Sequence, residues 1–179
     1  MAHAQVALIR GINVGRAKRV AMADLRALVE DLGYGDVRTL LNSGNVVFTT
    51  ARPAAGTAAA RIEKALATKL GISARVTVLC AADLAAALSD NPLLEVASDP
   101  ARLLVAVPSG PADRRKLEPL TRQDWTPEVL AVGTRVAYLW CAEGILASKL
   151  AAAVNRALGD AVTSRNWTTM MKLHALTQT

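Results

Sequence analysis

Two short runs of strand-forming residues lie on either side of a four-residue turn. Residues 37–41 and 46–50 contain the Val, Thr and Phe typical of β-strands, and residues 42–45 read Asn-Ser-Gly-Asn. Asn and Gly favour tight turns because both tolerate left-handed backbone conformations. The pattern therefore predicts a β-hairpin, and any fold of this chain must accommodate an antiparallel strand pair at this position.

The segments around the hairpin complete a βαββαβ order. Along the chain we expect a strand over residues 5–10, an amphipathic helix over 22–32, the two hairpin strands, a helix over 57–70 and a strand over 75–80. Gly33 and Gly71 are predicted to end the two helices, and Thr57 is predicted to cap the second. A short helix over 82–89 follows.

The same order recurs in the second half. After a linker at 98–100 we expect a strand over 102–107, a weaker helix over 112–120, hairpin strands over 128–132 and 135–140, a strong helix over 145–158, an edge strand over 161–163 and a terminal helix over 167–176. The chain is therefore predicted to be an α+β protein of two ferredoxin-like (βαββαβ-type) subdomains with duplicated topology. The predicted domains are residues 1–80, a helical connector over 81–100, and residues 101–179 with the terminal helix.

The composition fits a cytosolic protein that needs neither a metal nor a cofactor. The 179 residues are 52% apolar but only 3% aromatic, so the core must consist of Leu, Val, Ile and Ala. No apolar stretch reaches the length of a membrane span or a signal-peptide core, which predicts a cytoplasmic location and no membrane partner. Cys80 and Cys141 are far apart, so we expect buried thiols rather than a metal cluster. His3 and His174 lie near the termini, where neither a general base nor a metal ligand is expected.

The charge of the chain favours anionic partners. The formal net charge is +6 and the pI is ≈ 9.8. A basic surface attracts nucleic acids or small anions through its summed field. An arginine-rich and alanine-rich composition imposed by a GC-rich genome explains the same charge equally well, so the charge alone leaves both interpretations open.

The topology of the first half places one group of polar residues together. In a split βαβ unit the first strand ends at the same edge as the hairpin turn, and the first and third strands are neighbours, which brings Arg10 close to Asn45. Arg16, Lys18 and Arg19 add positive charge, with no acidic residue between positions 10 and 19. The predicted ligand-binding residues of this group are Arg10, Asn13, Arg16, Lys18, Ser43 and Asn45.

A second polar group is expected in the other half. The start of the helix over 145–158 should lie at the edge where the last strand ends, near Arg165 and Asn166. The free N–H groups and the dipole at a helix N-terminus favour anions. Lys149, Arg165 and Asn166 therefore complete the predicted ligand-binding set, and whether they share a cleft with the first group is left open.

Three specific interpretations compete with simpler ones. Gly11 and Gly15 follow a strand and precede a helix, but their spacing matches neither the dinucleotide nor the P-loop motif, which favours a glycine-shaped turn over a nucleotide cradle. Ser148 and Lys149 are adjacent, and neighbours on a helix point about 100° apart, which disfavours a Ser-Lys dyad. Trp167 is typical of a platform that stacks on a nucleobase, although a Trp at a helix start more often packs against the fold.

Several sequence blocks resemble one known family. They are ALIRGINVGR at residues 7–16, VAMADLRALVEDLGY at 20–34, DVRTLLNSGNVVF at 36–48, Asn91-Pro92, EGILASKL at 143–150 and SRNWTTMMKL at 164–173. Over nearly its whole length the chain is similar to the bacterial domain of unknown function family 1697. The resemblance implies a duplicated α+β fold related to the ferredoxin-like class, and no assigned reaction.

The resemblance also implies a set of motif positions. They are Arg10, Gly11, Asn13, Gly15, Ser43, Gly44, Asn45, Asn91, Pro92, Ser148, Lys149, Arg165, Asn166 and Trp167. The chain departs from the family at Arg16-Ala17, where a second glycine or small residue often follows Gly15. This departure argues against a phosphate cradle built from the loop backbone.

Three classes of function remain open. We expect binding of an anionic ligand, a nucleotide or a nucleic-acid phosphate, with Arg and Lys supplying charge and Asn and Ser supplying directional hydrogen bonds. One alternative is a metal-free enzyme that acts on a small polar substrate through Lys149 or Ser43. The other is a structural or protein-interaction module in which the same residues hold loops together.

Overall fold

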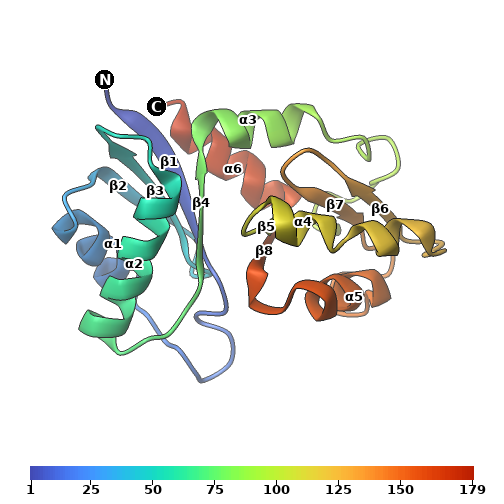
Figure 1. Ribbon diagram of the computed structural model, residues 1–179, viewed down its shortest axis with the longest axis horizontal. Helices are drawn as coiled ribbons and strands as arrows, with labels where there is room; N and C mark the ends of the chain where they lie inside the picture. Colours follow the sequence, from blue (N-terminus) through green and yellow to red (C-terminus); the bar gives the residue numbers. More distant parts are fainter. The chain divides into compact units, whose positions relative to one another are not determined.

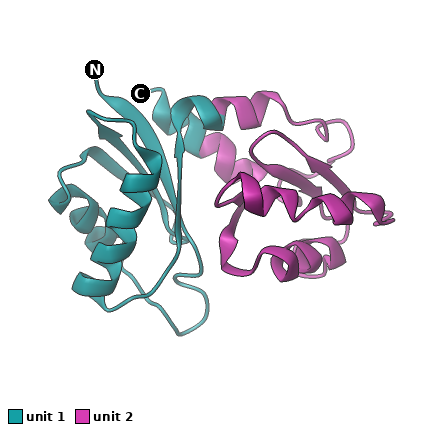
Figure 2. Ribbon diagram, viewed as in Figure 1, with its two compact units in different colours: residues 1–84, 173–179 teal, residues 85–172 magenta.

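The computed structural model describes residues 1–179 and divides into two compact units. Figure 2 colours them separately: the first contains Met1–Leu84 and Leu173–Thr179, and the second contains Ala85–Lys172. The division after Leu84 lies within the segment 81–100 that we expected to be a connector. Each unit contains one four-stranded antiparallel sheet (Figure 1).

The first unit folds in the predicted βαββαβ order. Its elements are β1 (His3–Ile9), α1 (Met22–Asp31), β2 (Gly35–Leu40), β3 (Asn45–Thr50), α2 (Ala55–Leu70) and β4 (Val76–Cys80), followed by α3 (Ala81–Ser89). The strands lie in the order β2-β3-β1-β4, and every neighbouring pair is antiparallel. The predicted pairing of the first and third strands is therefore confirmed.

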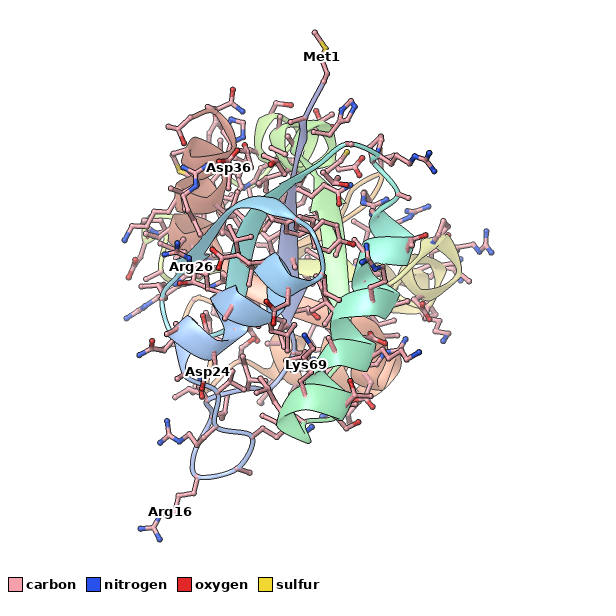
Figure 3. The ribbon with its side chains drawn as sticks, turned by 90° about the vertical axis from the view of Figure 1, so that its left-hand side faces the viewer. Met1, Arg16, Asp24, Arg26, Asp36 and Lys69 are labelled. Atoms are coloured by element: carbon pink, nitrogen blue, oxygen red, sulfur yellow. The ribbon has the colours of Figure 1, made fainter.

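The core of the first unit lies between the sheet and helices α1 and α2, which cover one sheet face (Figure 1, Figure 3). Ile9, Leu25 and Ile62 are among the aliphatic side chains buried there. The core contains one aromatic pair, Tyr34 and Phe48, whose ring centroids are 4.6 Å apart. Burial of aliphatic surface therefore supplies most of the driving force, as the low aromatic content predicts.

The second unit repeats this topology. Its elements are β5 (Leu103–Pro108), α4 (Pro111–Arg115), the 3-10 helix η1 (Glu118–Arg122), β6 (Val129–Val132), β7 (Ala137–Trp140), α5 (Lys149–Leu158), the 3-10 helix η2 (Gly159–Ala161) and β8 (Val162–Asn166). The last helix, α6 (Trp167–Thr177), begins in this unit and belongs to the first unit from Leu173 onward. The strand order is β6-β7-β5-β8, all antiparallel. The two similar α+β subdomains predicted from the sequence are confirmed.

Three helices differ from the prediction at their ends. The helix expected over 112–120 is split into α4 and η1, because Pro119 has no N–H group to continue the α-helix. Helix α5 begins at Lys149 rather than at residue 145, because Ser148 is extended and acts as its cap. Helix α2 begins at Ala55 after Ala54, so Thr57 lies inside the helix and does not cap it. None of the helices has the length and apolar character needed to cross a membrane.

The two cysteines differ in burial. Cys141 is fully buried, as expected, whereas Cys80 is only partly buried. Both are free thiols. The expectation of two buried thiols is therefore right for Cys141 and wrong for Cys80, which is the last residue of β4.

Candidate anion-binding site

The loop after β1 and the turn between β2 and β3 lie at the same edge of the first sheet. Leu8 is paired with Asn45 across β1 and β3, and the Ile9 N–H donates to the Gly44 carbonyl at 2.8 Å. The Arg10 N–H donates in turn to the carbonyl of Arg75 at 2.9 Å. We call residues 10–21, which connect β1 to α1, the cationic loop.

Asn13 holds the cationic loop in its conformation. Its Nδ2 donates to the carbonyls of Val20 at 2.9 Å and Asn42 at 2.7 Å, and its Oδ1 accepts from the Val20 N–H at 2.8 Å. Its own N–H donates to the carbonyl of Lys18 at 3.0 Å. The side chain therefore closes the loop on itself and ties it to the hairpin turn, so both amide hydrogens are already used.

Asn45 and Gly44 shape the hairpin turn. Asn45 is fully buried, and its Nδ2 donates to the Leu40 carbonyl and to Ser43 Oγ, each at 2.9 Å. Gly44 has a φ of +87°, and a Cβ at this position would lie 2.8 Å from Ile12. Only glycine fits both the backbone conformation and the contact with Ile12. These residues serve the turn, and Ser43 is the exposed member of the group.

Three cations of the loop are exposed and have no side-chain partner. Arg16, Lys18 and Arg19 form neither an ion pair nor a side-chain hydrogen bond in the structure. Figure 3 shows Arg16 at the tip of the loop, pointing away from the helices and the sheet. Three other basic side chains of the unit do have acidic partners: Arg26 pairs with Glu30 at 2.9 Å, Lys69 with Asp31 at 3.2 Å and Arg75 with Glu63 at 3.7 Å. The loop thus carries unneutralised positive charge.

A shallow cavity of ≈ 280 Å³ opens beside this loop. Its lining residues are Asn13, Arg19, Val20, Ala21, Met22 and Asn42. Ala21 occupies the N-cap position of α1 and provides no side-chain hydrogen bond, so the first-turn N–H groups of α1 lack a cap. Asp24 is the acidic residue of that first turn and does not line the cavity. The cavity therefore lies between Arg19 and a helix N-terminus that has no side-chain cap.

Little in the sequence predicts this cavity. Arg19 is distinguished there only by its charge, and Asn42 lies in a predicted turn. One signal was present: Val-Ala-Met at residues 20–22 offers no Ser, Thr, Asp or Asn to cap a helix that begins there. An uncapped helix start directly after a basic segment was therefore readable from the chain.

The second predicted group is organised differently, because an acidic side chain already occupies the N-terminus of α5. Ser148 Oγ donates to the Glu128 carboxylate and accepts from the Ala151 N–H at 2.9 Å. The other carboxylate oxygen accepts from the Leu150 N–H at 3.1 Å. Lys149 is the exposed first residue of the helix. Two of the N–H groups that we expected to attract a ligand are thus already bound, that of Leu150 by Glu128 and that of Ala151 by Ser148, and the sequence does not single out Glu128.

Arg165 and Asn166 also have internal roles. Asn166 Oδ1 accepts from the Thr169 N–H at 2.9 Å and so caps α6. The Arg165 guanidinium donates to the carbonyl of Ser164 at 2.9 Å, and burial lowers the pKa of Arg165 to about 10. Trp167 is buried at the start of α6, which fits packing rather than stacking on a base.

Comparison with known proteins finds one matching family and a solved structure of similar fold. The family model described as "Protein of unknown function (DUF1697)" matches residues 2–138. A solved structure of a conserved bacterial protein, SP0830 from Streptococcus pneumoniae, is 23% identical, with 99% of each chain covered and a TM-score of 0.78. This similarity shows a shared fold. A search of curated proteins found no match.

Proposed function

We propose that this chain, which belongs to the protein family of unknown function DUF1697, binds a phosphate-bearing anion at the cationic loop of its first unit. The ligand class is a nucleotide or a nucleic-acid phosphate. We place this binding in the bacterial cytoplasm, where such ligands are found.

The observation that carries the proposal is the lack of partners for Arg16, Lys18 and Arg19. Three like charges within four positions repel one another and gain nothing from a neighbouring carboxylate. A phosphate relieves this repulsion and accepts hydrogen bonds from guanidinium and ammonium groups, which are stronger than those between neutral groups.

The proposal divides the predicted residues into two roles. Asn13 and Asn45 hold the loop and the turn in place through hydrogen bonds to carbonyl groups. In this proposal Arg16, Lys18 and Arg19 contact phosphate groups. Arg19 does so at the cavity, where the N-terminal N–H groups of α1 supply a favourable field, whereas Arg16 and Lys18 do not line the cavity. The proposal thus gives Asn13 and Asn45 a structural role and the three cations a binding role.

The test compares two variants of equal net charge. In the loop variant Arg16, Lys18 and Arg19 are each replaced by Gln, and in the control variant the exposed Arg52, Lys64 and Arg122 are each replaced by Gln. Binding of a labelled single-stranded RNA is followed by fluorescence anisotropy, and binding of ATP by calorimetry. We expect the loop variant to bind about a hundredfold more weakly, since each lost hydrogen bond to a charged group costs about 1.5 kcal/mol or more in isolation and part of that is recovered by the rest of the site.

The two ligands distinguish the two sources of phosphate. Loss of RNA binding alone assigns the loop to a nucleic-acid backbone, and loss of ATP binding assigns it to a free nucleotide. If the control variant loses as much affinity as the loop variant, binding follows total charge rather than the cationic loop, and the proposal is wrong.

A further inference from the structure

We infer that Cys80 is a site of reversible oxidation, where a hydroperoxide converts the thiol to a sulfenic acid whose oxygen is bound by the carboxamide of Gln5. Both residues belong to the first unit, on strands β4 and β1. The inference is independent of anion binding at the cationic loop.

Gln5 is a polar side chain that the folded chain leaves without partners. It is fully buried in β1, and neither Nε2 nor Oε1 has a hydrogen-bond partner. A buried amide with no partner costs about 1–3 kcal/mol of stability. Such a cost is expected where a group awaits a ligand or a modified side chain that completes its hydrogen bonds.

Cys80 is the residue directly opposite this amide. Gln5 and Cys80 are paired across β1 and β4, so both side chains project from the same face of the sheet. Directly opposed residues of antiparallel strands have Cβ atoms about 5 Å apart. A glutamine side chain can span this separation, so its carboxamide can reach an oxygen added to the Cys80 sulfur, although it forms no hydrogen bond to the thiol itself.

Cys80 is partly exposed, and a backbone N–H group donates a hydrogen bond to its sulfur. The donor is the N–H of Asp83, at 3.4 Å from Sγ. Asp83 lies in the first turn of α3, where N–H groups stabilise negative charge on a nearby atom. A small oxidant can therefore approach the sulfur from solvent.

The reaction balances with the peroxide as sole co-reactant. The sulfur attacks one oxygen of a hydroperoxide ROOH, so an S–O bond forms as the O–O bond breaks. Sulfur loses two electrons, which reduce the departing oxygen, and that oxygen takes up the thiol proton and leaves as ROH. The product is Cys80–SOH, and a cellular thiol later restores the free cysteine through a mixed disulfide.

The sulfenic acid matches the two unsatisfied atoms of Gln5. Its O–H is a donor for Oε1, and its oxygen is an acceptor for Nε2. Cys141 lacks all of these features. It is fully buried, its sulfur faces the Leu139 carbonyl at 3.9 Å, and burial raises the pKa of its thiol. The chain thus contains its own control cysteine.

The test traps the sulfenic acid on the intact chain. The protein is treated with hydrogen peroxide in the presence of dimedone, digested with trypsin and examined by mass spectrometry. Tryptic cleavage places Cys80 in the peptide 76–102 and Cys141 in the peptide 136–149, so each thiol is read separately. We expect dimedone on the first peptide and not on the second in the folded protein, and on both after denaturation in urea.

A variant tests the role of the amide. In Gln5→Met the dimedone yield at Cys80 should fall about fivefold, while alkylation of Cys80 by iodoacetamide changes by less than about twofold. Gln5→Leu repeats the comparison, and circular dichroism selects whichever variant is folded. Equal dimedone yields in wild type and variant, no adduct on 76–102, or equal labelling of Cys141 in the folded protein would overturn the inference.

Discussion

The N-terminus of α1 and the N-terminus of α5 have the same local chemistry and different occupants. Both helices begin beside basic residues, at Arg19 for α1 and at Lys149 for α5. At α5 the chain supplies its own anion, Glu128, and its own cap, Ser148. At α1 the N-cap is Ala21, which forms no side-chain hydrogen bond, and the cavity beside it is lined by no acidic residue, although Asp24 stands in the first turn.

The comparison teaches that a helix N-terminus near positive charge becomes a candidate site only where the fold has not already satisfied it. The free N–H groups of a first helical turn can donate hydrogen bonds to any suitable acceptor. In the second unit side chains of the chain itself accept these bonds, so the N–H groups are no longer available to a ligand. In the first unit no side chain caps the start of α1, which leaves its N–H groups available to a ligand.

The largest expected effect comes from breaking the turn that supports the first region. Gly44→Ala should lower the free energy of unfolding by about 3 kcal/mol, because the new Cβ meets Ile12 and the backbone is left-handed. Chemical denaturation measures this. Gly56→Ala is the control, since a Cβ there has no atom within 4 Å and lies in a helix. Equal free energies of unfolding for the two variants would contradict the claim that position 44 of the turn requires glycine.

A smaller effect is expected from loosening the loop itself. Asn13→Ala removes three side-chain hydrogen bonds and should cost about 2 kcal/mol of unfolding free energy, because the residue is only partly buried. Anion binding should weaken with it, since the cations lose their fixed positions. A variant that is destabilised yet binds RNA like the wild type would show that loop order does not matter for binding.

Removing the internal anion tests the second region. Glu128→Gln should lower stability by about 1 kcal/mol, because the amide keeps one acceptor but loses the charge at the N-terminus of α5. Added sulfate should then raise the melting temperature of this variant more than that of the wild type. A sulfate effect that is the same in both proteins would contradict the view that Glu128 fills an anion site.

The smallest change makes the first region resemble the second. Ala21→Asp supplies a cap and a charge at α1 and should raise stability by up to about 1 kcal/mol while weakening RNA binding. Ala21→Ser supplies the cap without the charge and serves as the control. Binding that is unchanged in Ala21→Asp would mean that the ligand does not use the start of α1.

Most of the fold was readable from the sequence because its signals are local. The Asn-Ser-Gly-Asn turn indicates the first hairpin, and Gly71 ends α2 as predicted. Pro119 is an equally local signal for the break between α4 and η1, although the helix expected over 112–120 runs through it. Helix starts were less predictable, since Ala54 caps α2 with no side-chain hydrogen bond.

The site was less predictable because its contacts are not local. The Glu128 carboxylate binds the start of α5 from 22 positions away, and Asn13 donates to Asn42 from 29 positions away. Neither contact produces a residue pattern from which it could be predicted. Without these partners, Asn13 and Asn166 looked like donors for a ligand, whereas in the structure they hold a loop and cap a helix.

The salt dependence of RNA binding tests the central claim most directly. The logarithm of the binding constant is measured against the logarithm of salt concentration for the wild type, the loop variant and the matched control variant. If Arg16, Lys18 and Arg19 each neutralise a phosphate, the loop variant should lose about 2 units of slope and the control variant almost none. Equal slopes in the wild type and the loop variant would contradict the claim that these three cations form the binding surface.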